Sequence, residues 1–215
     1  MSTRALWTQC KDCALCQSSR YQSPPLLGIF GDNPILVVAQ NPGEAKQHRP
    51  EHVQAAAEMT AAGTLREPDA LAYLYKNDFI HSYAYKVGLH QFFGADWLDR
   101  FDYTNAVRCR TPINEYPSAE MMFNCGREYT SKLIRRYDAI IFIGAAARMQ
   151  FNLMMSPVSS LSPMVIRKGK TGRLYLAVPH YAARDIDFQL VKRRVEELVS
   201  RVRSLHEQSS EDVEV

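Results

Sequence analysis

Five cysteines carry the most distinctive chemistry in this 215-residue chain. Two residues separate Cys10 from Cys13, and fifteen separate Cys109 from Cys125. Thiolates from one tight turn and from a second, distant segment are what a [4Fe-4S] cluster or a structural zinc ion needs. Cys16 repeats the two-residue spacing, so any two of the three N-terminal cysteines could ligate. Metal or cluster ligation is favoured over disulfides, because the spacings are unequal and no export signal precedes them.

Polar side chains also stand at the ends of apolar, β-branched runs. Asn41 follows the first of these runs, and Asn105 stands near the end of the second. The order of runs and intervening helical segments predicts an α/β fold, a three-layer α/β/α sandwich with a short, mainly parallel central sheet. Open sheets of this kind bind ligands beyond the carboxyl ends of their strands. The four runs cover residues 35–40, 103–107, 139–143 and 174–178.

Helices must link and cover these strands. Ser118 is a candidate N-cap for a helix that carries Cys125, since a serine side chain can accept from a free backbone N–H of the first turn. Residues 51–100 also have a helical composition, broken by Gly63 and Pro68. The sequence therefore predicts that one cysteine of the second pair lies on a helix.

The length and composition fit one domain. We predict a single domain over residues 1–206 that includes an N-terminal cluster-binding segment, and a disordered acidic tail over residues 207–215. No run approaches the ~18 apolar residues of a membrane span, and no signal peptide is apparent. The protein is expected in the cytoplasm, away from membranes. A net charge of +3 permits nucleic-acid binding without indicating it.

The cysteine spacing and the motifs around it resemble the iron–sulfur uracil-DNA glycosylases of families four and five. This resemblance implies the sandwich fold of those enzymes and a structural [4Fe-4S] cluster held by Cys10, Cys13, Cys109 and Cys125, with Cys16 as a spare. The resemblance runs in order from about Cys10 to Arg203. Its motifs are Cys10-x2-Cys13-x-Leu15, Arg20, Asn41-Pro42-Gly43-Glu44, Asn105-x3-Cys109-Arg110-x-Pro112 and Cys125.

The same resemblance assigns roles to the polar residues at the strand ends. In that superfamily the loop after the first strand orients the attacking water, which here implies Asn41. Iron–sulfur members usually carry Glu at the position of Gln40, whereas Gln40 and Asn41 look like the form found in mismatch-specific and single-strand-selective branches. Gln40 and Asn105 are expected to bind the base, because an amide offers a donor and an acceptor together. An Asx-type turn at Asn41 and a backbone-satisfied Asn105 are the alternatives.

A third loop resembles the family loop whose His stabilises the departing base and whose apolar residues wedge into the DNA stack. Without a gap, the family His falls on Val178; with a two-residue deletion His180 takes its place. His180 is thus implied as a catalytic residue. The alanines of the loop would form a wedge smaller than the family's leucines. The DNA-contacting residues implied here are Ala182, Ala183 and Arg184.

The family's base-stacking Phe has no counterpart in this chain, because Arg49-Pro50 is followed by Glu51. Phe79, Tyr83 or Tyr85 could supply a stacking ring. An aromatic residue at helical spacing is more often a core residue, so this assignment stays open.

Basic residues near the cysteines and in a predicted hairpin complete the expected DNA surface. Arg108 and Arg110 flank Cys109, and Lys168 and Lys170 lie in a basic turn. Such cations can contact phosphates. A solvated hairpin tip is the alternative for the two lysines.

Together these features predict a monomeric DNA base-excision glycosylase. It would hydrolyse the N-glycosidic bond of uracil, or of a related deaminated or modified base, and carry a structural [4Fe-4S] cluster. Two alternatives remain open. One is a glycosylase-fold enzyme of changed purpose that acts on a modified nucleotide. The other is a non-catalytic cluster or zinc protein that binds nucleic acid.

Overall fold

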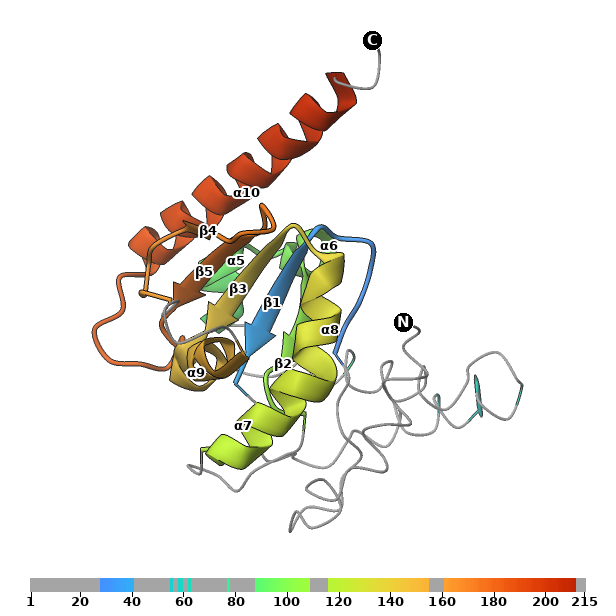
Figure 1. The fold of residues 1–215 in the computed structure, drawn as a ribbon, viewed down its shortest axis with the longest axis vertical. Coiled ribbons are helices and arrows are strands. Elements are labelled where there is room, and N and C mark those ends of the chain that lie inside the picture. Colours follow the sequence, from blue (N-terminus) through green and yellow to red (C-terminus); the bar gives the residue numbers. More distant parts are fainter. Residues whose placement is uncertain are drawn as a thin grey trace.

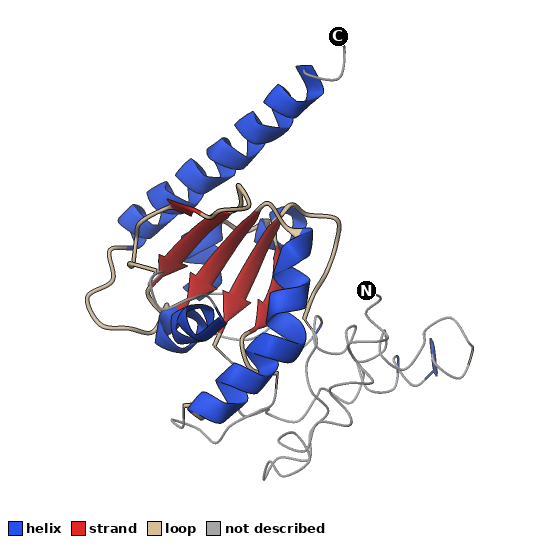
Figure 2. Ribbon diagram, in the orientation of Figure 1, coloured by secondary structure: helices blue, strands red, loops and turns tan. Residues whose placement is uncertain are grey.

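The computed structural model describes residues 28–40, 88–108, 116–154 and 161–211, with a few isolated positions between 55 and 77. In this part of the chain a central sheet has helices on both sides (Figures 1 and 2). The long C-terminal helix runs alongside the sheet and extends well beyond it (Figure 1).

The sheet has five strands in the order β2-β1-β3-β5-β4. Neighbouring strands pair in parallel across the sheet, except that β4 is antiparallel to β5. The expected α/β class with a mainly parallel sheet is therefore confirmed. The strands are β1 Ile35–Ala39, β2 Asp102–Asn105, β3 Ala139–Ile143, β4 Arg167–Lys168 and β5 Leu174–Val178.

The three central strands are apolar along their whole length because both of their faces are covered. Every residue of β1, β3 and β5 is buried. A strand that met water on one face would alternate apolar and polar residues instead. The continuous runs in the sequence thus predicted both the strands and their central position.

Helices on the two faces contribute to two separate cores. One core includes Val37 and Ile141 and packs against α5, α6 and α10. The other includes Val38 and Ile140 and packs against α8, η3 and α9. This packing is compatible with the predicted three-layer arrangement. The helices are α5 His90–Phe93, α6 Trp97–Arg100, α7 Ala119–Cys125, η2 Gly126–Thr130, α8 Ser131–Leu133, η3 Ile134–Arg136, α9 Gly144–Met154 and α10 Phe188–Glu211.

The helix that carries Cys125 begins as the sequence predicted. The Ser118 side chain accepts a hydrogen bond from the backbone N–H of Met121 at 3.1 Å, which satisfies one free donor of the first turn. Beyond Cys125 the chain stays helical through η2, α8 and η3. The element η2 is a π-helical turn, a local widening that often marks functional sites.

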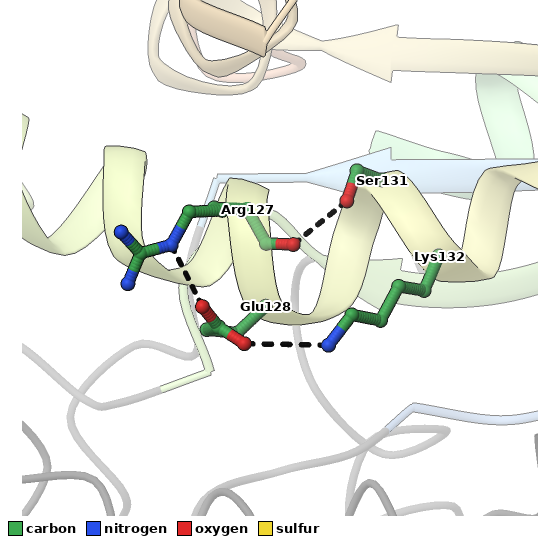
Figure 3. A network of polar contacts seen from close by, with 4 residues as sticks. All are labelled: Arg127, Glu128, Ser131 and Lys132. Atoms are coloured by element: carbon green, nitrogen blue, oxygen red, sulfur yellow. Dashed lines mark hydrogen bonds and ion pairs between the residues drawn. The ribbon is translucent and has the colours of Figure 1, made fainter.

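The exposed side of this π-turn carries a small ionic network (Figure 3). Glu128 lies between two cations, accepting from Arg127 Nε at 2.7 Å and from Lys132 Nζ at 3.3 Å. Hydrogen bonds from Arg127 and then from Lys132 lower the pKa of Glu128. Because the network faces solvent, it adds little to stability.

The strand β2 ends two residues earlier than the predicted run. After Asn105 the chain turns across the end of β1, where Ala106 N–H donates to Ala39 O at 2.7 Å. Val107 N–H donates to Gln40 O at 3.0 Å. These bonds fasten the segment that leads to Cys109 to the end of β1.

The C-terminal helix α10 continues to Glu211, into the tail that we predicted to begin at residue 207. The first residues of the tail that we expected to be disordered are thus helical, which fits the absence of Pro or Gly in this stretch. Among the described residues, no helix combines the length and apolarity needed to cross a membrane.

Candidate active site at the carboxyl edge of the sheet

The carboxyl ends of the parallel strands meet at one edge of the sheet, which we call the carboxyl edge. β1 and β3 are neighbours in the sheet. The strand that follows β1 in sequence, β2, lies on one side of this pair, and the strands that follow β3 lie on the other, so the chain leaves β1 and β3 in opposite directions. Such a switch point is where open α/β sheets bind ligands. Three predicted site residues stand at this edge: Gln40 after β1, Asn105 at the end of β2, and His180 after β5.

The His180 ring lies against the first residue after β3. Gly144 has φ +83° there, and an added Cβ would lie 3.3 Å from His180 Cβ and 3.4 Å from Cδ2. A glycine therefore fits both the backbone conformation and the close approach of the ring. This contact ties the loop after β5 to the end of β3.

One backbone hydrogen bond selects the tautomer of His180. The Ala182 N–H donates to Nδ1 at 3.2 Å. A ring nitrogen that accepts carries no proton, so in the neutral ring Nε2 carries it. Burial also lowers the pKa of His180 from its ordinary value of 6.5. At neutral pH the side chain is therefore an uncharged Nε2–H donor.

Tyr181 anchors the same loop, a feature that motif reasoning missed. Its ring stacks against His180 with a centroid distance of 4.1 Å and an interplanar angle of 33°. A Cβ added at Gly88 would lie 2.3 Å from Tyr181 Cγ. Gly88 is thus needed for the segment before α5 to pass the Tyr181 ring. No sequence signal linked these two residues.

Asn105 is 1% exposed and lies beside Ala39 of β1 in the parallel register. The Tyr103 hydroxyl, two residues earlier on the same strand face, donates to Asn105 Oδ1 at 3.3 Å. This contact orients the amide. The predicted location of Asn105 at a strand end is observed, whereas its role in reading a base stays a prediction.

Gln40 is half-buried, and its carbonyl accepts from Val107 as described above. Asn41, the predicted water-orienting residue, lies outside the described residues. The same holds for the three stacking candidates, Phe79, Tyr83 and Tyr85.

Gln150 of α9 joins the exit of β2 to the helix that carries Cys125. It is fully buried, and its Nε2 donates to Ala106 O at 2.5 Å and to Met122 O at 2.9 Å. Cys125 packs beside Val107 in a small apolar cluster. No local pattern in the sequence indicated the role of Gln150, because a glutamine within a helix gives no sign of what it contacts.

Arg108 differs from the expected phosphate-binding residue. It is 1% exposed, and its guanidinium lies 4.7 Å from the centroid of the Tyr129 ring. The turn at Ala106 and Val107 directs this side chain inward over the π-turn. In this structure Arg108 therefore does not offer a cation at the surface.

The other predicted DNA contacts fall into two separate places. Ala182, Ala183 and Arg184 are exposed at the carboxyl edge, close to His180. Lys168 and Lys170 lie at the start of β5, because Lys168 pairs with Leu174. The hairpin is thus at the opposite end of the sheet (Figure 1), and the single surface that we expected is divided. Arg110 lies outside the described residues.

Three of the four predicted cluster ligands, Cys10, Cys13 and Cys109, lie outside the described residues. Cys125 is described and buried. Within the described part of the chain, no three His, Cys, Asp or Glu side chains are grouped to hold a metal ion. The three other predicted ligands lie outside that part of the chain, so the predicted cluster remains a prediction.

No model of a known protein family matches this sequence, and a search of curated proteins finds no significant match. The resemblance of the motifs to iron–sulfur glycosylases therefore stays a prediction. Any function has to be argued from the residues and their geometry.

Proposed function

We propose that this protein is a DNA base-excision glycosylase that hydrolyses the N-glycosidic bond of uracil or of a related deaminated base. One observation carries the proposal. The half-buried His180 ring accepts the Ala182 N–H at Nδ1, which leaves Nε2 as its donor atom, at the carboxyl edge of the sheet where Asn105 also lies. The spacing of the cysteines and motifs supports the same reaction class.

The reaction needs a donor for an anionic leaving group. Cleavage of a base–sugar bond gives an oxocarbenium-like sugar and a base that leaves with negative charge. A neutral imidazole whose Nδ1 accepts a hydrogen bond can donate one from its Nε2–H to this base. The bond from Ala182 to Nδ1 keeps the ring in the tautomer that this role requires.

The base itself must be held after it leaves the DNA stack. Asn105 supplies an amide whose Oδ1 already accepts from Tyr103, which limits the rotation of the side chain. An oriented amide can distinguish the edge of uracil from that of cytosine, since the two edges differ in donors and acceptors. Gln40, on the neighbouring strand, is the second proposed base contact. Asn41 would hold the attacking water.

The proposed cluster would be structural. A [4Fe-4S] cluster bound by four thiolates joins distant chain segments and supplies no hydrolytic step here. Val107, two residues before Cys109, packs with Cys125, and Gln150 bonds to both segments. These contacts favour Cys109 and Cys125 as neighbouring ligands. Cys10 and Cys13 would supply the other two.

A base-excision panel tests the proposed function. Uracil, hypoxanthine, xanthine and hydroxymethyluracil are placed in single- and double-stranded oligonucleotides, and base release is measured. We expect release of at least one base, with a ~10²–10⁴-fold lower rate for His180→Ala, as for loss of a positioned acid or base. Asn41→Ala and Asn105→Ala should also lose most of the activity.

Other outcomes would contradict the assignment. A neutral effect of His180→Ala in an active enzyme would remove His180 from the mechanism. Binding of oligonucleotide without release of any base would favour the non-catalytic alternative. Iron and acid-labile sulfide analysis of anaerobically purified protein tests the cluster separately, and stoichiometric zinc in colourless protein would exclude it.

A further inference from the structure

Positive charge gathers at the end of the sheet opposite the candidate active site. Two segments meet there, since Arg173 Nη2 donates to Arg135 O at 3.1 Å and Leu174 N–H donates to Asp138 O at 2.9 Å. Within residues 135–138 and 167–173, Asp138 is the one acid. We call this surface the basic edge; its cations are Arg135, Arg136, Arg167, Lys168, Lys170 and Arg173.

Arg173 holds the basic edge in a fixed shape. Besides Arg135 O, its guanidinium reaches Tyr137 O at 2.6 Å and Thr171 Oγ1 at 3.2 Å. The turn is closed by Gly169 N–H, which donates to Arg173 O at 2.8 Å. The hairpin is therefore fastened to the end of η3. A surface that is already ordered loses less entropy when it binds a ligand.

Four of these cations, Arg135, Arg136, Lys168 and Lys170, are exposed. The whole chain is nearly balanced, with 26 basic and 23 acidic residues, so this concentration of one sign is local. Asp138 is contacted by His206 Nε2 at 2.8 Å, on the side of α10. Like charges held together repel one another, and a polyanion relieves that repulsion.

We propose that the basic edge binds the phosphate backbone of a second segment of DNA duplex, apart from the segment whose base enters the candidate active site. This inference rests on the proposed function for the identity of the nucleic acid. Lys and Arg side chains contact phosphates regardless of sequence. A membrane surface fits less well, because the described ranges 135–138 and 167–173 expose no large apolar side chain for insertion.

The length of the strands separates the two surfaces. β5 has five residues between the hairpin and the His180 loop, and a strand rises ~3.3 Å per residue. The basic edge and the carboxyl edge are therefore about 16 Å apart along the strand. Contacts at the basic edge would add affinity for long duplexes without touching the target base.

A salt titration of duplex binding tests the basic edge. The double variant Lys168→Gln/Lys170→Gln is compared with wild type on a long duplex that contains no damaged base. Each phosphate contact contributes about 0.9 to the slope of log K against log salt, so loss of two should reduce its magnitude by about 1.8. The matched control is Lys192→Gln/Arg193→Gln, which removes the same charge from exposed positions of α10.

The slope should be unchanged in this control. An unchanged slope in the hairpin variant, or an equal fall in both variants, would overturn the proposal. Binding of wild type to anionic phospholipid vesicles that is lost in the hairpin variant, with unaltered DNA binding, would overturn it in favour of a membrane surface. Wild type is assayed for base release in parallel. If no base is released while the slope difference persists, the proposed function fails, whereas the binding of duplex DNA at the basic edge is supported.

Discussion

Single side chains at the carboxyl edge owe their chemistry to the atoms that surround them. His180 has its tautomer set by Ala182 and its pKa lowered by burial. Asn105 has its amide oriented by Tyr103. A sequence places a His and an Asn near strand ends, whereas these neighbours decide whether each side chain donates or accepts.

The pH dependence of stability provides a test at His180. Because the folded state has the lower pKa, the unfolded state binds more protons as the pH falls below the ordinary value of 6.5. Stability contributed by this site is therefore complete above that pH and declines below it. We expect urea unfolding to show a larger loss between about pH 7.5 and 5.5 in wild type than in His180→Gln. Equal losses in the two proteins would contradict the lowered pKa.

Alanine variants of two glycines distinguish the effect of backbone strain from the effect of the contact with His180. Gly144 and Gly172 both have φ +83°, but an added Cβ meets His180 at Gly144 and nothing within 4 Å at Gly172. Both alanine variants should lose about 1–2 kcal/mol of unfolding free energy from the left-handed backbone. Gly144→Ala alone should shift the NMR signals of the His180 ring. A similar shift in Gly172→Ala would show that the contact has no specific effect.

Arg108 is predicted to stabilise the fold without contacting DNA. Its buried guanidinium over Tyr129 implies a cation–π interaction worth about 2 kcal/mol when desolvated. Arg108→Ala should therefore lower the free energy of unfolding by at least that amount, since buried packing is also lost. Arg127→Ala, at a largely exposed position, should change it by less than about 0.5 kcal/mol. If Arg108→Ala instead reduced the salt dependence of DNA binding, the result would support the phosphate contact first predicted for Arg108.

At the scale of elements, α9 holds the end of β2 against α7 through Gln150. The side chain donates to one carbonyl on each segment. Cys125 follows Met122 on α7, and Cys109 follows Ala106 along the chain. Gln150 therefore holds together the segment that leads to Cys109 and the helix that carries Cys125, the two proposed ligands of the second cysteine pair.

Removal of the Gln150 amide should destabilise the protein and its proposed cluster together. Gln150→Leu leaves the buried Ala106 carbonyl oxygen without this donor, at about 1–3 kcal/mol, whereas Met122 O keeps its bond from the Gly126 N–H. We expect a lower urea midpoint and a lower iron content per chain. Met149→Ala, at an exposed neighbouring position, is the control and should alter neither. A stable Gln150→Leu variant with full iron content would show that the two bonds are dispensable.

At the scale of the whole molecule, α10 covers one face of the sheet and continues beyond it (Figure 1). Its buried residues extend to Val202, and Leu205 is partly buried. The remainder of the helix is exposed up to residue 208. The helix therefore divides into a part that belongs to the core and a terminal part that does not.

Two truncations test this division. Removal of residues 207–215 should change the free energy of unfolding by less than about 0.5 kcal/mol, as at other exposed positions. Removal of residues 199–215 also takes away Val199 and Val202, and burial of each contributes about 1.5–3 kcal/mol. Thermal unfolding compares the two with the full chain. A large loss from the shorter truncation would mean that the acidic end stabilises the fold.

Local patterns in the sequence were enough to predict the α/β class, the central strands and the Ser118 cap. Continuous apolar runs indicate strands covered on both faces, and the cap depends only on residues three apart. The same patterns placed Asn105 near the end of one strand and His180 beyond the end of another. Each of these features depends on neighbours in sequence, so tertiary packing was not needed to find it.

Tertiary structure alone decided which of these residues meet. The burial of Arg108 depends on a turn across the end of β1, and the bonds of Gln150 join three segments distant in sequence. The hairpin lysines lie away from His180 because they precede β5 whereas His180 follows it, and a strand holds its two ends apart. The pattern of apolar residues along the sequence indicates which side chains are buried. Strand order and chain direction determine what each buried side chain contacts.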